Sequence, residues 1–443
     1  MSDASRERDR GVDGLRALAI LGVVLGHWLV TALVTDSGTV RTASPLRAFP
    51  QLTPLSWLFQ TLAVFFLVGG LVAARGRAGS SKSRATSSEG RSASDQSHAA
   101  SGEGRSASGE GRSASGEGRS ASGEGRSASG EGRSASGEGY LTWLGGRMAR
   151  LFRPVAVVPA VWVVISVAML AGGVGLDTVR TLAKLVWSPL WFLLVFTALT
   201  AATPLVARLR PIWPLAAVAL VDLLRYGLGG PGGPGGPGGP GGPGWLGWLG
   251  WLGWLGWVNV LAGWLVPYCL GLTWGRNGMP GRGTGWALLL GGAAATAGLV
   301  LWAGYPAAMV GVPGAETSNL DPPTLAAVTF GLAQCGAARL LLGPLRRALR
   351  RPLAWAAVSA VNLRAITIFL WHQTAMITVT ALGLLAGQAL PGLHTAPDSA
   401  GWVLARVAWL PVFGLALAAC AAAFRGHERR RRPGKAFYRL ERK

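Results

Sequence analysis

Long uncharged runs of mostly apolar residues divide this 443-residue chain, and they constrain its fold more than any other feature. The first extends from Ala17 to Thr35, close to the ~20 residues that a helix needs to cross a bilayer. A run over 211–221 is shorter, and Asp222 and Arg225 follow it closely. The other runs are 48–74, 154–176, 185–207, 245–275, 283–315, 322–338, 407–424 and 353–386, the last with one arginine inside it. Together they predict an all-α, polytopic membrane protein with about ten transmembrane helices.

The charged residues lie mostly outside these runs and indicate how the helices are oriented. Half of the residues are hydrophobic and only 14% are charged, yet the net charge is +22; a soluble domain has roughly 25% charged residues. With a cytoplasmic N-terminus, 35 of the 42 Lys and Arg fall in cytoplasmic segments and five in outer ones, as the positive-inside rule requires. This argues against a soluble enzyme and against a nucleic-acid partner, because the basic residues flank membrane spans. It predicts a multi-pass protein of the cytoplasmic (plasma) membrane with both termini in the cytoplasm.

Low-complexity sequence separates the second and third predicted helices. Residues 102–136 are five copies of Gly-Glu-Gly-Arg-Ser-Ala-Ser, which carry no net charge and offer nothing to bury, so they predict a flexible tether. The predicted organisation is helices 1–2 in residues 1–75, a cytoplasmic linker in 76–139, helices 3–10 in 140–424 and a basic cytoplasmic tail in 425–443.

Three ionisable residues of the first helix project from one face. Arg16 and His27 are 11 positions apart, which at ~100° per residue is a difference of ~20° in azimuth and about 16 Å along the axis. Asp13 lies about 40° from His27 by the same geometry. Ionisable residues inside a membrane are candidates for function, and one extended ligand could contact both Arg16 and His27. The structural alternative is an arginine that reaches the interface and a histidine that packs between helices.

Two further groups of polar residues have both a structural and a functional interpretation. Arg147, Arg150 and Arg153 precede the third helix and are either topology signals or an anion site. His372 lies in the middle of the ninth helix, where a structural hydrogen bond and a site role are both open. The three cysteines show no metal-ligand spacing, so neither a metal site nor a bound cofactor is predicted.

Several short motifs occur in the order found in one membrane-enzyme family. Asp13-Gly14-Leu15-Arg16, followed after ten intervening residues by His27, resembles the Asp-Gly-x-Arg start and the Arg-x(10)-His pattern of the acyltransferase family 3 membrane proteins. Later segments are similar to further motifs of that family, with Gly69 in place of the serine in Phe-Phe-x-x-Ser-Gly. These segments are Phe65–Gly70, Arg147–Arg150, Leu190–Leu193 and Phe369–His372.

The resemblance implies transfer of an acyl group from a cytoplasmic acyl-CoA to a hydroxyl or amine of an envelope glycan, a lipid or a small molecule. It implies that His27 is the catalytic residue, either as a general base or as a transient acyl carrier. Arg16 would hold the donor, Asp13 would orient Arg16, and membrane lipids are the other expected partners. The residues expected to bind substrates are Asp13, Arg16, Arg147, Arg150, Arg153, Trp191 and His372.

Two other functions are alternatives at this point. A transporter or exporter of envelope components could use the same polar face as a permeation path, although the sequence has no paired inverted repeats with broken helices and no acidic residue in mid-span. A non-catalytic scaffold for envelope synthesis could use the tether to bind partners. An assay of acyl transfer separates the enzyme from both.

Overall fold

Helices make up most of the computed structural model, which describes residues 9–36, 38–76, 145, 155–224, 256–310, 318–320 and 322–424. Eight helical segments in these ranges are long and apolar enough to cross a membrane, and this confirms the prediction of an all-α polytopic membrane protein. They are α1 (Arg10–Val30), Pro50–Gly76, Leu176–Ala201, α10 (Val258–Asn277), α11 (Arg282–Trp302), α12 (Leu325–Ala348), Ala365–Ala386 and α15 (Ala400–Ala423). Arg147, Arg150 and Arg153, the linker beyond residue 76 and the basic tail lie outside the described residues.

Shorter helices complete the described part of the chain. Leu176–Ala201 consists of α6 (Leu176–Trp187) and α7 (Leu190–Ala201), and Ala365–Ala386 consists of α14 (Ala365–Gly383) and one 3₁₀ turn. The remaining helices are α2 (Pro45–Ala48), α3 (Thr53–Ser56), Val155–Ala171, α8 (Thr203–Val206), α9 (Ile212–Asp222) and α13 (Pro352–Leu363). Each of the ten predicted segments contains at least one helix, while the number that cross a membrane stays a prediction.

The first helix ends earlier than its uncharged run predicts. α1 stops at Val30, and an antiparallel hairpin of β1 (Ala32–Asp36) and β2 (Thr39–Ala43) follows it. Threonine and valine dominate these strands, and β-branched side chains favour extended structure. Gly38 adopts a φ of 80° in the turn, a conformation that suits glycine. The prediction from the uncharged run, which ends at Thr35, therefore places the end of this helix too late in the sequence.

Two later helices also depart from the predicted boundaries. α12 continues ten residues beyond the predicted end at 338 to Ala348, because arginine is compatible with a helix even where it interrupts an uncharged run. The run 353–386 is divided at Arg364, whose φ of −113° and ψ of 15° separate α13 from α14. Asn362, in the last turn of α13, donates its side-chain N–H to the backbone oxygen of Asp13 at 2.8 Å.

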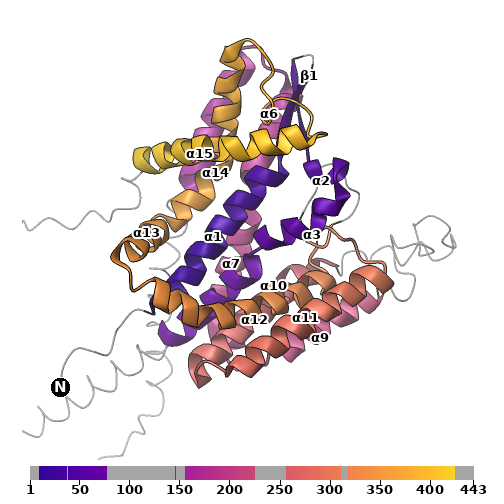
Figure 1. The fold of residues 1–443 in the computed structure, drawn as a ribbon, viewed down its shortest axis with the longest axis vertical. Coiled ribbons are helices and arrows are strands. Elements are labelled where there is room, and N and C mark those ends of the chain that lie inside the picture. Colours follow the sequence, from indigo (N-terminus) through magenta and orange to yellow (C-terminus); the bar gives the residue numbers. More distant parts are fainter. Residues whose placement is uncertain are drawn as a thin grey trace, which may run out of the picture.

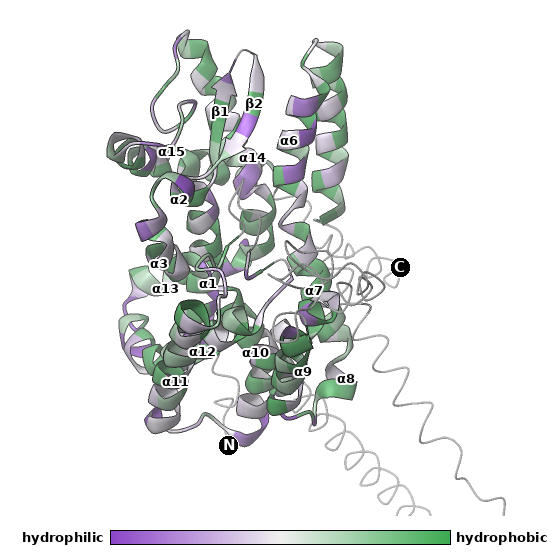
Figure 2. Cartoon of the chain, turned by 90° about the vertical axis from the view of Figure 1, so that its right-hand side faces the viewer, coloured by the Kyte–Doolittle hydropathy of each residue, from purple (hydrophilic) through white to green (hydrophobic). Residues whose placement is uncertain are grey.

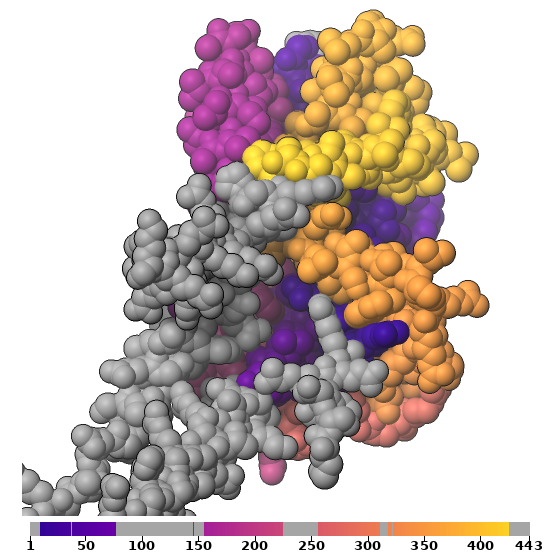
Figure 3. Space-filling model, turned by 90° about the vertical axis from the view of Figure 1, so that its left-hand side faces the viewer, coloured from indigo at the N-terminus to yellow at the C-terminus, as the bar shows by residue number. Residues whose placement is uncertain are grey.

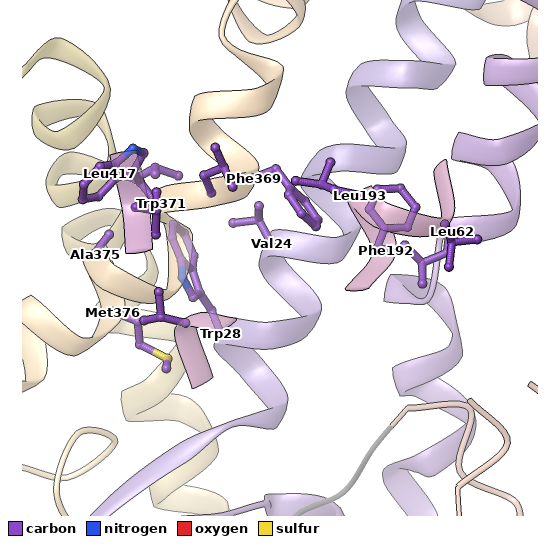
Figure 4. Packing of buried hydrophobic residues seen from close by; sticks show 14 of the residues in the cluster. Val24, Trp28, Leu62, Phe192, Leu193, Phe369, Trp371, Ala375, Met376 and Leu417 are labelled. Atoms are coloured by element: carbon purple, nitrogen blue, oxygen red, sulfur yellow. The ribbon is translucent and has the colours of Figure 1, made fainter. Parts of the chain in front are cut away.

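α1 lies at the centre of the fold and carries the predicted catalytic face. It packs against α12, α13 and α14, and Figure 1 shows it running obliquely between α14 and the group formed by α10, α11 and α12. The largest apolar cluster joins α1, α7 and α14; Figure 4 shows Val24 and Phe369 facing Phe192 and Leu193. Apolar residues (green in Figure 2) run along most of the helices, as lipid-facing surfaces require.

The helix over 62–76 and α10 approach each other so closely that their backbones touch. A Cβ atom on Gly271 would overlap the carbonyl oxygen of Leu67, and one on Gly70 would overlap that of Tyr268. Small residues allow membrane helices to pack at such distances, where dispersion contacts hold them together. The same helix carries Phe65 and Phe66, so this contact fixes one wall of the site described below.

Replacing Gly271 by valine should therefore destabilise the folded protein strongly. Overpacking typically costs ~1–3 kcal/mol, and here the neighbouring atoms belong to backbone that cannot rotate away. The matched control is Gly291→Val in α11, where an added Cβ meets nothing within 4 Å. Thermal unfolding in detergent should show a large decrease in Tm for Gly271→Val and a small decrease in Tm for Gly291→Val. Equal decreases in Tm would mean that the close contact between the 62–76 helix and α10 does not contribute to the stability of the protein.

Three chain segments meet at one end of the molecule around Asp9. This residue caps the start of α1 by accepting the N–H of Gly11 at 3.1 Å, and Arg346 of α12 donates to it at 2.7 and 3.1 Å. Arg75, at the end of the second segment, lies 3.5 Å away. Burial by itself raises the pKa of the Asp9 carboxyl, but Arg346 and Arg75 bring that pKa below its ordinary value. The distribution of Lys and Arg predicts that the segments of Asp9, Arg75 and Arg346 all lie at the cytoplasmic face of the membrane.

The predicted orientation can be tested at the two ends of the molecule. Arg350 follows α12 at the Asp9 end, whereas Arg41 lies on the hairpin, and both are exposed. In a background without the three native cysteines, Arg41→Cys should react with a membrane-impermeant maleimide in intact cells. Arg350→Cys should react only after the cells are permeabilised. Labelling of Arg350→Cys from outside would reverse the whole topology.

Candidate functional site

The two predicted intramembrane histidines lie next to each other. The ring centroids of His27 on α1 and His372 on α14 are 5.1 Å apart, with an angle of 40° between the rings. Trp28 fixes the two helices at this level, since its indole N–H donates to the backbone oxygen of His372 at 2.9 Å. Helical periodicity relates residues of one helix only, and these two histidines are on different helices. Their proximity is therefore a result of the packing of α1 on α14.

His372 is fully buried and has one ring nitrogen without a hydrogen-bond partner among the described residues. Its Nδ1 lies 2.6 Å from the backbone oxygen of Phe369, and because a carbonyl oxygen only accepts, Nδ1 must carry the hydrogen. The unpartnered atom is Nε2, which in the neutral ring then holds a lone pair. A buried acceptor without a donor is costly in a folded protein, so His372 is prepared to receive a hydrogen bond.

His27 opens onto a cavity of about 450 Å³. It is partly exposed there, and the predicted substrate-binding residue Trp191 forms part of the same wall. The polar side chains around the cavity belong to Thr31, Gln60, Ser188 and Ser318, next to the aromatic Phe59 and Trp257 and to apolar residues. None of the described residues that line it is aspartate, glutamate, lysine or arginine.

Arg16 lines a second, much narrower cavity that adjoins the first beside α1. Its volume is about 30 Å³, and its walls include Ala365, Ile366 and Phe369 at the start of α14. Val23 and Leu62 line both cavities, so the cavity of Arg16 and the cavity of His27 share a wall. The shared face of Arg16 and His27 inferred from helical geometry thus faces the interior of the bundle.

The aromatic residues of two predicted motifs form the wall between the helices. Phe65 and Phe192 both line the narrow cavity, with ring centroids 4.9 Å apart. At Gly69, where the family motif has serine, an added Cβ would overlap the ring of Phe196. The glycine therefore makes room for an aromatic ring, and the hydroxyl that the family carries at this point is missing here.

The remaining predicted site residues divide into two groups. Asp13 is buried near the start of α1, where its backbone oxygen accepts a hydrogen bond from Asn362, and it is not among the residues that line the two cavities. Its proposed orientation of Arg16 stays a prediction. Arg147, Arg150 and Arg153 lie outside the described residues, so their predicted contacts with a donor stay predictions as well.

Arg406 is a buried residue beside the site for which no role was predicted from the sequence. Only 1% of it is exposed, and its guanidinium donates to the backbone oxygens of Trp28 at 2.6 Å and Thr31 at 2.6 Å. A lone arginine within the apolar run of α15 is an unusual residue for a membrane span. Its position in a membrane span could have marked Arg406 as a candidate functional residue from the sequence, but it does not predict which groups the arginine binds.

Comparison with known proteins identifies the family. The sequence profile of the acyltransferase domain family named Acyl_transf_3 matches residues 9–425, nearly the whole chain. Searches of curated proteins and of solved structures found no match. With its helical segments of membrane-spanning length, the chain belongs to the Acyl_transf_3 family and is a multi-pass membrane acyltransferase.

Proposed function

We propose that the protein transfers an acyl group from acyl-CoA, bound at the Arg16 end of α1, to a hydroxyl group held in the cavity beside His27. The observation that carries this proposal is that Arg16 and His27, on one face of α1, line two adjoining cavities that share Val23 and Leu62 in their walls. A cationic anchor at one end and a histidine at the other match a donor with charged phosphates and a reactive thioester. The membrane would be the cytoplasmic membrane, and the acceptor an envelope glycan, a lipid or a small molecule.

His27 would act as the general base. One ring nitrogen removes the proton of the acceptor hydroxyl while the oxygen attacks the thioester carbonyl. When the tetrahedral intermediate collapses, the carbon–sulfur bond breaks and the CoA thiolate takes the proton from the His27 imidazolium. The products are an acyl ester and free CoA, and His27 returns to its neutral form. In the alternative mechanism, the ring nitrogen of His27 first attacks the thioester carbonyl and displaces the CoA thiolate, which forms a transient acyl-histidine. The acceptor hydroxyl then attacks this acyl group, loses its proton, and releases His27.

His372 would hold His27 in the correct tautomer. Its unpartnered Nε2 can accept the N–H of the neighbouring His27 ring after a small rotation, because the centroids are only 5.1 Å apart. The other nitrogen of His27 would then carry the lone pair and face the cavity. This role replaces a direct contact of His372 with donor or acceptor as the better supported assignment.

The donor would approach from the end of α1 that carries Arg16. The guanidinium suits a phosphate group, and the distance of about 16 Å between Arg16 and His27 along the helix suits the long arm that precedes the thioester. The narrow cavity, about 30 Å³ in this structure, has room for about one water molecule, so the helices around it would have to move apart to admit the arm. Arg147 and Arg150 would add phosphate contacts, and Asp13 would orient Arg16.

A hydroxyl fits the cavity better than an amine as the acceptor. An alkylammonium group would need a negative partner or would lose its charge on entering, and no aspartate or glutamate lines the cavity among the described residues. A hydroxyl needs only a base and hydrogen-bonding neighbours, which His27, Gln60 and Ser188 supply. We therefore favour O-acyl transfer.

The proposal is tested with labelled acetyl-CoA and membranes from cells that contain or lack the protein. Label should enter a glycan, lipid or small-molecule fraction only when the protein is present, and one equivalent of free CoA should appear for each group transferred. The label should be lost on treatment with mild base, which cleaves esters, and should resist it if an amide forms. Movement of an unmodified solute across vesicles without use of acetyl-CoA would support the transporter instead.

A further inference from the structure

Arg406 on α15 binds the C-terminal end of α1 with two of its guanidinium nitrogens. Besides the backbone oxygens of Trp28 and Thr31, it donates to that of Gly392 at 2.8 Å, and it contacts the sulfur of Met376 at 2.9 Å. Its charge also lies 4.7 Å from the ring centroid of Phe413. Figure 3 shows α15 (yellow) lying across the molecule beside the orange α14. One side chain thus joins α15, α14, α1 and the segment that follows α14.

The partners of Arg406 are unusual for a buried cation. Every hydrogen-bond acceptor given above is a carbonyl oxygen or a thioether, and no ion pair joins Arg406 to a carboxylate in the described part of the chain. Two of the oxygens belong to Trp28, in the last turn of α1, and to Thr31, its C-cap, where the helix dipole is negative and carbonyls lack partners within the helix. Arg406 therefore closes the end of the helix that bears His27, and it does so at the residue directly after His27.

Trp28 transmits this contact to the histidine pair. Its backbone oxygen is held by Arg406, its indole N–H by the backbone of His372, and its ring packs against Phe413 at a centroid distance of 5.5 Å. His27 precedes Trp28 on α1, and His372 carries the carbonyl that Trp28 binds. Two hydrogen bonds in series thus join Arg406 to the backbone next to both histidine rings, whose centroids are 5.1 Å apart.

We propose that Arg406 is a positioning residue of the acyltransferase, which holds the last turn of α1 so that the rings of His27 and His372 face each other. A hydrophobic side chain of similar size could fill the same space without the cost of burying a charge. What it could not do is fix two carbonyls of α1 at once through a planar fork of donors. This inference rests on the proposed role of His27 and adds a residue that acts through it.

The test compares Arg406→Met and Arg406→Lys with a variant that is destabilised elsewhere. Gly292→Ala places a methyl group against the backbone of α12 at Thr329 and Ala333, and Gly292 lines neither cavity. Transfer from labelled acetyl-CoA is measured per folded protein, well below the unfolding temperature of each variant. Arg406→Met should reduce kcat by about 10²-fold with little change in KM, as expected when reacting groups are displaced by about 1 Å. Arg406→Lys should restore part of the rate, and Gly292→Ala should keep the wild-type rate.

Trp28→Phe keeps an aromatic ring but removes the indole donor to His372, so it tests the same chain of contacts if Arg406→Met does not fold. A reduced kcat with unchanged KM in Trp28→Phe supports the proposal. Normal kcat in folded Arg406→Met, or in Trp28→Phe, overturns it, as does a loss in Gly292→Ala that matches the loss at Arg406. His27→Ala is measured alongside. If it is active, the proposed function fails; if it is inactive while the Arg406 and Trp28 variants are normal, only the positioning role fails.

Discussion

Replacing His27 by alanine should reduce the rate of acyl transfer by about 10²–10⁴-fold, the usual contribution of a general base. The apparent affinity for acetyl-CoA should stay nearly unchanged, because the donor phosphates are expected at the other end of α1. His27 is partly exposed to the cavity rather than packed in the core, so its removal should leave folding intact. The measurement is transfer of labelled acetyl groups per folded protein in membranes.

The control for this prediction is His394, a buried histidine between α14 and α15 that lines neither cavity. Its Nε2 bonds the backbone oxygen of Thr380 at 2.7 Å, and its Nδ1 accepts the N–H of Leu390 at 3.1 Å. Both nitrogens have structural partners, so His394→Ala should lower thermal stability but keep transfer per folded molecule. If folded His27→Ala retains near-normal transfer, the mechanism proposed here is wrong. If it is inactive only because it is degraded, His27 is a packing residue.

Replacing Arg16 by alanine should instead weaken the binding of the donor. A charge-assisted hydrogen bond to a phosphate contributes about 1.5–3 kcal/mol, which corresponds to an increase of roughly 10- to 150-fold in KM for acetyl-CoA. Arg16→Lys should recover only part of the affinity, since lysine is a point charge without the planar fork. Initial rates at a series of acetyl-CoA concentrations separate this effect from a loss in kcat.

Arg282→Ala is the matched control for Arg16. It removes an exposed arginine at the first position of α11, which lines neither cavity, and it should leave KM unchanged. An equal rise in KM for both variants would point to a general effect of surface charge on an anionic donor. A normal KM in Arg16→Ala would place the donor phosphates elsewhere, with Arg147 and Arg150 as the next candidates.

The helical fold could be predicted because apolar runs of sufficient length have few other solutions in a bilayer. The ends of the helices could not, since they depend on local chemistry that a charge count ignores. Thr35 lacks a charge yet lies in a strand, and Arg339 and Arg346 carry charges yet lie inside α12. The break at Arg364 depends on how α13 and α14 pack against α1, which no property of the segment alone specifies.

The site shows the same division between local and tertiary information. The shared face of Arg16 and His27 follows from helical periodicity alone, but the proximity of His27 to His372, Trp191 and Arg406 requires helices from distant parts of the chain to meet. Asp222 illustrates the limit. In the sequence it only marks the end of a short apolar run, whereas in the structure it is a buried acceptor for three other segments. It accepts hydrogen bonds from Asn259, Tyr305 and the backbone N–H of Leu325 at 2.9, 3.1 and 2.6 Å.

The joint at Arg364 also matches the chain to the thickness of a bilayer. α13 has 12 residues and α14 has 19; as one straight helix with the joint they would measure about 48 Å, against a hydrocarbon core of about 30 Å. α14 alone measures about 29 Å. α13 instead follows the first turns of α1, where Arg10 lies 5.1 Å from the ring centroid of Trp355. A thinner or thicker membrane would therefore tilt α14, and with it His372, while Asn362 of α13 keeps its hydrogen bond to the backbone oxygen of Asp13 on α1.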